Sequence, residues 1–274
     1  FNAIFVPLMI ILVLFVGVAP LSRWKRTSTA YLIQQLSKVA MAGLVVGVVL
    51  PFIILLEFSL AATLAVALGA WITLSIVKDI SNKATNKATI WQGLGSLSLS
   101  YYGMQAAHFG VAVMFVGVGL TSYFSSEKSV LLQPGQSTEL DVYSFTFVQS
   151  VPVTGPNYIG DEAQIMVRRN GADIEVLYPQ RRVYLASGTP STEMAIDAGF
   201  LRDLFVTLGE EKESGAWSMT IYVKPFVRWI WLGAILMAFG GTLAAGDKRY
   251  RRLRQRRIAA VNEEISASFS LIKS

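Results

Sequence analysis

The sequence predicts a membrane α-helical bundle of about five transmembrane helices, with an extracytoplasmic β-rich domain inserted before the last one. Composition is the first reason: 53% of the 274 residues are hydrophobic and only 15% are charged, with a mean hydropathy of +0.49. A soluble domain carries about 25% charged residues. The second reason is a set of long apolar runs, and the third is a stretch of alternating polar and apolar residues before the last run.

The apolar runs define the helices, because a span needs roughly 20 mostly apolar residues. Five windows meet this requirement, at about residues 2–20, 39–57, 59–77, 101–122 and 226–245. The first window could instead be a signal peptide, but its basic residues follow the run, whereas those of a signal peptide precede it. The second and third windows are separated only around Glu57–Ser59, so we expect a tight hairpin there.

The basic residues orient these spans. They gather after the first, third and fifth windows: Arg23, Lys25, Arg26 and Lys38; Lys78, Lys83 and Lys87; and Lys248, Arg249, Arg251, Arg252, Arg254, Arg256 and Arg257. If five spans alternate, these segments share one side, which the positive-inside rule makes cytoplasmic. The last basic run directly follows a span, which favours a topology signal and contact with anionic lipid over nucleic-acid binding.

We therefore divide the chain into four transmembrane helices at 1–122, an external domain at 123–224, a last transmembrane helix at 225–246 and a basic cytoplasmic tail at 247–274. The external segment holds 13 acidic and 8 basic residues, a net charge of −5, against +6 for the whole chain. The first residue is Phe and not Met, so we expect the chain to be part of something larger or a processed product.

Local patterns in residues 123–224 predict strands. Residues 129–140 suggest two strands joined by a Pro-Gly turn, residues 142–148 alternate, and residues 217–226 form a last strand. Asn170-Gly171 lies between two alternating runs, which is typical of a type I′ hairpin. A short helix is expected from Thr192. We expect a small sandwich or barrel-like domain, with most of its aromatic residues at core positions: Tyr143, Phe145, Phe147, Tyr158 and Tyr178.

Composition also limits the chemistry. The chain has no cysteine, which excludes thiol redox chemistry, thiolate metal sites and disulfides within it, and it has one histidine. No P-loop, Ser-His-Asp arrangement or row of intramembrane carboxylates is indicated. Gly43 and Gly47 form a GxxxG-like pair, which more often serves helix packing than function. Trp229, Trp231 and Tyr222 suggest an interfacial aromatic belt, with Arg228 reaching outward beside them.

The candidate functional residue is His108, inside the fourth window and about 10 Å beyond its start at 1.5 Å per residue. An ionisable side chain there normally faces a cavity or a partner. On a helix it is flanked by Met104, Gln105, Val111, Ala112 and Phe115. Neutral imidazole is a good iron ligand. From the residue alone, an interhelical hydrogen bond, haem ligation, a proton relay and a quinone contact all stay open. Gly103, Ala107 and Gly110 beside it could admit a helix or a ring.

Four segments carry a family resemblance: AHFGVAVMFVGVGLTS around His108, GPNY at Gly155–Tyr158, TEMAIDAGFLRDLFVTLGE at Thr192–Glu210, and YVKPFVRWIWLGAILMAFGG at Tyr222–Gly241. They resemble the C-terminal part of the CcmF family of cytochrome c-type biogenesis proteins. The resemblance extends over nearly the whole chain and includes its order of helices, external β domain and final helix.

The resemblance implies a haem lyase that takes haem from the haem chaperone CcmE and attaches it to the CXXCH motifs of apocytochrome c. It implies a multi-pass protein of the bacterial or mitochondrial inner membrane, with the β domain on the periplasmic side in bacteria. It also implies an intramembrane b-type haem held by two histidines, of which His108 corresponds to one by its context. Further implied partners are CcmH/CcmI-type subunits that handle apocytochrome.

This chain departs from the family pattern in lacking the tryptophan-rich segment, the external haem-binding histidines and the second b-haem histidine. We therefore expect an N-terminal portion of CcmF as a further partner and expect the chain alone to be inactive. The alternative hypothesis is a non-catalytic scaffold or docking subunit of the maturation complex, in which His108 only packs. No catalytic residue is assigned.

Overall fold

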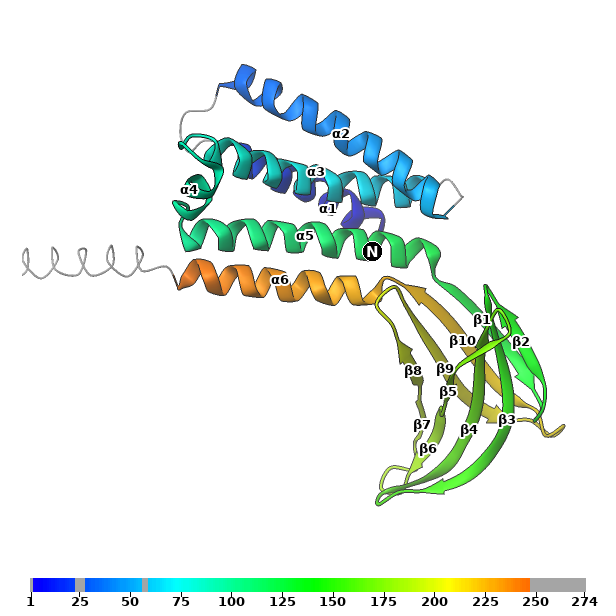
Figure 1. The fold of residues 1–274 in the computed structure, drawn as a ribbon. Coiled ribbons are helices and arrows are strands. Elements are labelled where there is room, and N and C mark those ends of the chain that lie inside the picture. Colours follow the sequence, from blue (N-terminus) through cyan, green and yellow to red (C-terminus); the bar gives the residue numbers. More distant parts are fainter. Residues whose placement is uncertain (1, 23–27, 56–58, 247–274) are drawn as a thin grey trace, which may run out of the picture. The chain divides into compact units, whose positions relative to one another are not determined.

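A computed structural model describes residues 2–22, 28–55 and 59–246 (Figure 1). The chain divides into two compact units, Phe1–Val116 with Trp231–Ser274, and Gly117–Ile230. Three sequence-based expectations lie outside the described residues. These are the basic residues at 23–26, the turn of the predicted hairpin at 56–58, and the basic tail at 247–274.

The apolar runs form helices, as predicted. The helices are α1 (Asn2–Val18), the short 3-10 turn η1 (Ala19–Leu21), α2 (Thr29–Leu55), α3 (Leu60–Ala84), α4 (Ile90–Gly95), α5 (Leu99–Phe124) and α6 (Val227–Ala245). Within the described residues, five of them are long and apolar enough to cross a membrane, which confirms the predicted number. Helix α2 starts ten residues earlier than the predicted window, because a helix can continue through polar residues beyond the apolar run. Helix α4 was not predicted.

Helix α3 holds the first unit together. Its side chains Leu68, Trp71, Ile72 and Ile76 form a buried core with residues of α1, α2 and α5. The Trp71 indole N–H donates to the Leu14 carbonyl of α1 at 3.2 Å, and Gly17 leaves the space for that ring, because a Cβ there would lie 1.9 Å from Trp71 Nε1. A Cβ at Gly47 would lie 2.4 Å from the Cβ of Ala67. The GxxxG-like pair therefore serves helix packing.

Two antiparallel sheets form the second unit. The strands are β1 (Ser126–Leu132), β2 (Ser137–Leu140), β3 (Tyr143–Thr154), β4 (Tyr158–Arg169), β5 (Ala172–Leu177), β6 (Gln180–Tyr184), β7 (Pro190–Glu193), β8 (Ala195–Ala198), β9 (Arg202–Glu211) and β10 (Trp217–Pro225). One sheet has the order β1-β10-β9-β8, and the other has the order β2-β3-β4-β6-β7 with β5 also paired to β4. The predicted sandwich-like fold is confirmed.

Alternation in the strands builds the core of this domain. Phe145 and Phe147 of β3 and Val206 and Leu208 of β9 are fully buried, and they pack in one apolar cluster between the sheets. Tyr143 is buried and Tyr158 half-buried, whereas Tyr178 is 51% exposed, so core placement was wrong for that residue. The predicted type I′ hairpin is present, since Asn170 and Gly171 have φ of 50° and 84°.

The short helix expected from Thr192 is wrong, because this segment belongs to strands. Residues 192–193 end β7, and Ala195–Ala198 forms β8, in which Ala195 pairs with Val206 and Ile196 with Phe205. The run of Glu, Met and Ala favours a helix by local propensity. Pairing along β9 supplies backbone hydrogen bonds to the edge of a sheet and overrides that preference.

Candidate functional site

His108 lies in the middle of α5, and its ring has a defined hydrogen bond. Nδ1 is 2.8 Å from the Met104 carbonyl oxygen one turn earlier. A carbonyl oxygen only accepts, so Nδ1 carries the proton and donates it. An imidazole in this tautomer has its lone pair on Nε2. Nε2 makes no hydrogen bond to any residue in the part of the chain that the structure describes.

One face of α5 packs against α6 through small residues. A Cβ at Gly110 would lie 2.6 Å from the Gly233 carbonyl oxygen, and a Cβ at Gly103 would lie 2.5 Å from the Gly240 carbonyl oxygen. The two helices thus approach with their backbones nearly in contact. Of the two expectations for these glycines, close approach of a helix or of a ring, the structure shows the helix.

A second face of α5 meets α3 through a polar cluster that the sequence analysis missed. Asp79 Oδ2 accepts hydrogen bonds from Lys83 Nζ at 2.8 Å, from the Tyr101 hydroxyl at 2.7 Å and from Gln105 Nε2 at 2.7 Å. Asp79 and Gln105 are only 5% and 4% exposed. The signal was available as Asp79 and Lys83 at i and i+4, but the partners on α5 could not be read from spacing.

His108 lies on the opposite side of α5 from the α6 contact and beside the α3 contact. At 3.6 residues per turn it lies about 160° around the helix from Gly110 and about 60° from Gln105. Its neighbours Met104, Val111 and Phe115 are half-buried, as is His108 itself. Val111 and Phe115 also pack against the buried cluster of α1, α2 and α3, so the imidazole lies at the edge of the face that α5 turns toward these helices.

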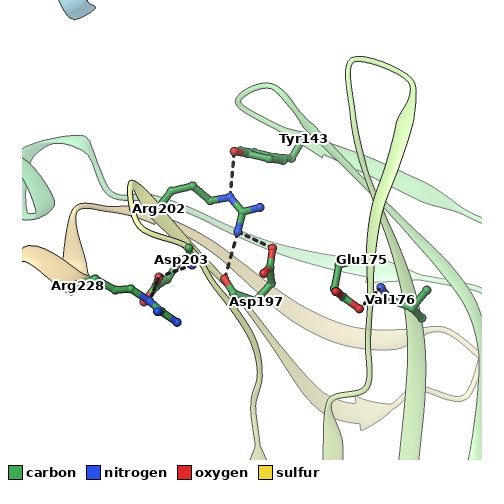
Figure 2. Close-up of polar contacts among 8 residues, drawn as sticks. Tyr143, Glu175, Val176, Asp197, Arg202, Asp203 and Arg228 are labelled. Carbon is green, nitrogen blue, oxygen red and sulfur yellow. Dashed lines mark hydrogen bonds and ion pairs between the residues drawn. The ribbon is translucent and has the colours of Figure 1, made fainter.

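The external domain has its own polar cluster, which bridges the two sheets (Figure 2). Arg202 at the start of β9 donates to the Tyr143 hydroxyl at 3.1 Å and to the Asp197 carbonyl at 3.2 Å, and it pairs with the Asp197 carboxylate. Arg228 Nε lies 3.8 Å from Asp203 Oδ1. Burial raises the pKa of Asp203, and the Gly199 N–H and Arg228 partly offset that rise. Arg228 thus has a protein partner in this unit.

The described residues contain no cluster of three or more His, Asp or Glu side chains that could hold a metal ion. Among the described residues, the imidazole of His108 is therefore the candidate for binding a metal ion.

Known proteins are similar to this chain in sequence and in architecture. Residues 123–225 match the family model described as "CcmF C-terminal beta-sandwich". The cytochrome c-type biogenesis protein CcmF of Pseudomonas fluorescens is 44% identical over 251 residues, which cover 92% of this chain and 38% of that protein. The chain matches the C-terminal portion of CcmF proteins. The CcmF protein of Escherichia coli is 38% identical over 252 residues, again covering 92% of this chain and 38% of the relative.

A solved structure described as "Cytochrome c Heme Lyase CcmF" has the same fold, with a TM-score of 0.74 at 21% identity, covering 89% of this chain and 40% of that one. The chain therefore spans about two fifths of the length of these relatives. Both the helices and the sandwich belong to the shared fold.

Proposed function

We propose that this chain is the C-terminal part of a cytochrome c haem lyase, which takes haem from CcmE and attaches it to the CXXCH motifs of apocytochrome c. We propose further that His108 is an axial ligand of an intramembrane b-type haem. The names of the relatives and the shared fold support the first statement. The hydrogen bond from His108 Nδ1 to the Met104 carbonyl carries the second.

The ring fits a haem ligand by its donor set. Ligating histidines usually donate their other N–H to a carbonyl or carboxylate, which fixes the tautomer and the ring orientation. His108 has this arrangement, and Nε2 is the nitrogen left for iron. A b-type haem held there would supply one-electron redox chemistry. Because the chain has one histidine, a bis-histidine site requires a second nitrogen from the N-terminal portion of CcmF.

Topology and partners follow from the same proposal. With five spans and the basic segments taken as cytoplasmic, the positive-inside rule supports a β domain, residues 123–224, on the periplasmic side of the bacterial inner membrane. From there it can meet CcmE, apocytochrome c and the CcmH/CcmI-type subunits that handle apocytochrome. The lyase reaction belongs to the complete protein, so we assign no catalytic residue to this portion.

The decisive experiment replaces His108 with Gly in the complete protein and measures haem content and the haem absorption spectrum of the purified protein. We expect the b-type spectrum to be lost, because no other imidazole in this chain can replace it. Added imidazole should restore the spectrum, since it can enter the space left by the side chain. Rescue of this kind separates ligation from a packing role.

Tyr102→Phe is the matched control, because it removes a polar group of the same helix whose hydroxyl bonds the Leu94 carbonyl at 2.8 Å. It should leave the haem spectrum unchanged. If His108→Gly retained full b-type haem, the ligand assignment would be wrong, and a docking role for this portion would be the better account.

A further inference from the structure

The turn between β8 and β9 presents two large apolar side chains to the outside of the domain. Phe200 is 63% exposed and Leu201 is 58% exposed. The turn is well defined: Ala198 pairs with Asp203, and the Gly199 N–H donates to Asp203 Oδ1 at 3.1 Å. Two adjacent large apolar side chains at the tip of an exposed turn indicate contact with a partner or with a membrane.

The same turn is bonded to the residue that precedes α6. The Phe226 N–H donates to the Leu201 carbonyl at 2.9 Å. The Phe200 and Phe226 rings both contact the ring of Trp229, with centroids 6.0 Å and 5.2 Å away. Phe226 itself has a φ of 59°, a left-handed conformation that is rare for an aromatic residue. Strand β10 turns into α6 at this residue, and the β8–β9 turn is fixed to that point.

Helix α6 sets the level of the turn relative to lipid. Its apolar stretch runs over Val227–Ala245 and is long enough to span a membrane, so the membrane surface meets its first turn. Arg228 and Trp229 in that turn are residue types found at the interface. Asp203 beneath the apolar tip lies 3.8 Å from Arg228 and accepts from Gly199 (Figure 2). The positive charge of Arg228 therefore compensates the negative charge of Asp203 near the interface.

We propose that Phe200 and Leu201 insert into the lipid interface, between headgroups and acyl chains, and form a third membrane attachment of the β domain beside the ends of α5 and α6. The partner is lipid, because Phe200 of the turn contacts Trp229 in the first turn of a membrane span and the tip of the turn is apolar. A tryptophan beside the tip and an arginine able to meet a lipid phosphate complete an interfacial arrangement. This inference does not depend on the haem proposal.

The test uses single cysteines, which suits a chain without native cysteine. The complete protein, with any cysteines elsewhere changed to serine, carries Phe200→Cys labelled with bimane and is reconstituted in phosphatidylcholine and phosphatidylglycerol vesicles. Emission is recorded with and without lipids that bear a nitroxide near the headgroup, and with water-soluble iodide as the second quencher. Asn170→Cys, at the exposed β4–β5 turn, is the aqueous control.

We expect the label at position 200 to be quenched by the nitroxide lipid and protected from iodide, and the label at position 170 to show the reverse. Quenching by iodide alone at position 200 would show a water-exposed turn and overturn the proposal. Protection from both quenchers would show that protein covers the turn and would also overturn it. Leu201→Cys provides the same measurement if Phe200→Cys does not fold. Neither variant touches His108, so haem content reports separately on the haem proposal.

Discussion

The side-chain amide of Gln105 donates a hydrogen bond to Asp79 Oδ2 across 2.7 Å and links α5 to α3 three residues before His108. Both residues are buried, so the bond is shielded from water and is strengthened by the charge of the carboxylate. It fixes the rotation of α5 about its axis. The direction in which the His108 ring points therefore depends on a residue of another helix.

Asp79→Asn tests this link. Asn can place its amide oxygen at the position of Oδ2 but loses the negative charge that strengthens the three hydrogen bonds, so we expect a loss of about 1–3 kcal/mol in the free energy of unfolding. Unfolding in SDS followed by circular dichroism measures it. Lys83→Arg is the control: it keeps a cation beside Asp79 at the half-exposed position of the pair and should cost about 1 kcal/mol or less. Equal losses in the two variants would contradict the role given to the buried bonds.

Gly110→Ala tests the contact between α5 and α6. The new methyl group would lie 2.6 Å from the Gly233 carbonyl oxygen, and backbone atoms must move to admit it. We expect a loss of about 1–3 kcal/mol in SDS unfolding. Gly241→Ala is the matched change, because its Cβ would meet nothing within 4 Å, and it should stabilise α6 by about 0.5–1 kcal/mol. A neutral Gly110→Ala would mean that the helices are further apart than described.

Arg202→Met tests the bridge between the two sheets. It removes the bonds to the Tyr143 hydroxyl and to Asp197 and leaves a partly buried carboxylate without its partner. The expected cost is about 1–3 kcal/mol, seen as faster amide hydrogen exchange in β8 and β9. Arg168→Met breaks a pair whose side chains are both about half-exposed and should cost about 1 kcal/mol or less. Unchanged exchange in β8 after Arg202→Met would argue against the bridge.

Asp203 should make the stability of the domain depend on pH. Burial raises its pKa above the ordinary value of 3.8. A group with a raised pKa contributes stability that is fully present below the unfolded pKa and is lost as pH rises through the folded pKa. Asp203→Asn lacks this loss, so its stability relative to the unchanged protein should increase as pH rises through that window. Thermal unfolding across the acidic range measures the difference, and parallel curves for the two proteins would refute the shift.

Much of the fold was predictable because two simple periodicities dominate this sequence. Unbroken apolar runs such as that of α3 have few alternatives to a span, and the Asn170-Gly171 turn requires two positive φ angles that this pair adopts readily. The predictions failed where pairing with a strand elsewhere in the chain decides the local structure. Residues from Thr192 favour a helix locally, but they lie beside β9 and form strands. Helix α4, six residues long, is too short for a periodic pattern to show it.

The candidate site also contains one part that the sequence predicts and another that it does not. His108 is identifiable because a lone imidazole within an apolar run is conspicuous, and its i−4 carbonyl partner follows from helix geometry. The Asp79 cluster joins residues 22 and 26 positions apart in the sequence, and the Arg202 bridge joins residues 59 positions apart. Neither separation matches a helical or strand period, so only the folded chain brings these groups together.

Strands β1 and β10 pair with each other, with Ser126 opposite Val223, and the Thr121 hydroxyl donates to the Pro225 carbonyl at 2.6 Å. The polypeptide therefore enters and leaves the sandwich at neighbouring points. An insertion with this property costs its host little loop-closure entropy. A short glycine-serine linker replacing residues 126–225 should therefore leave the hairpin of α5 and α6 able to form.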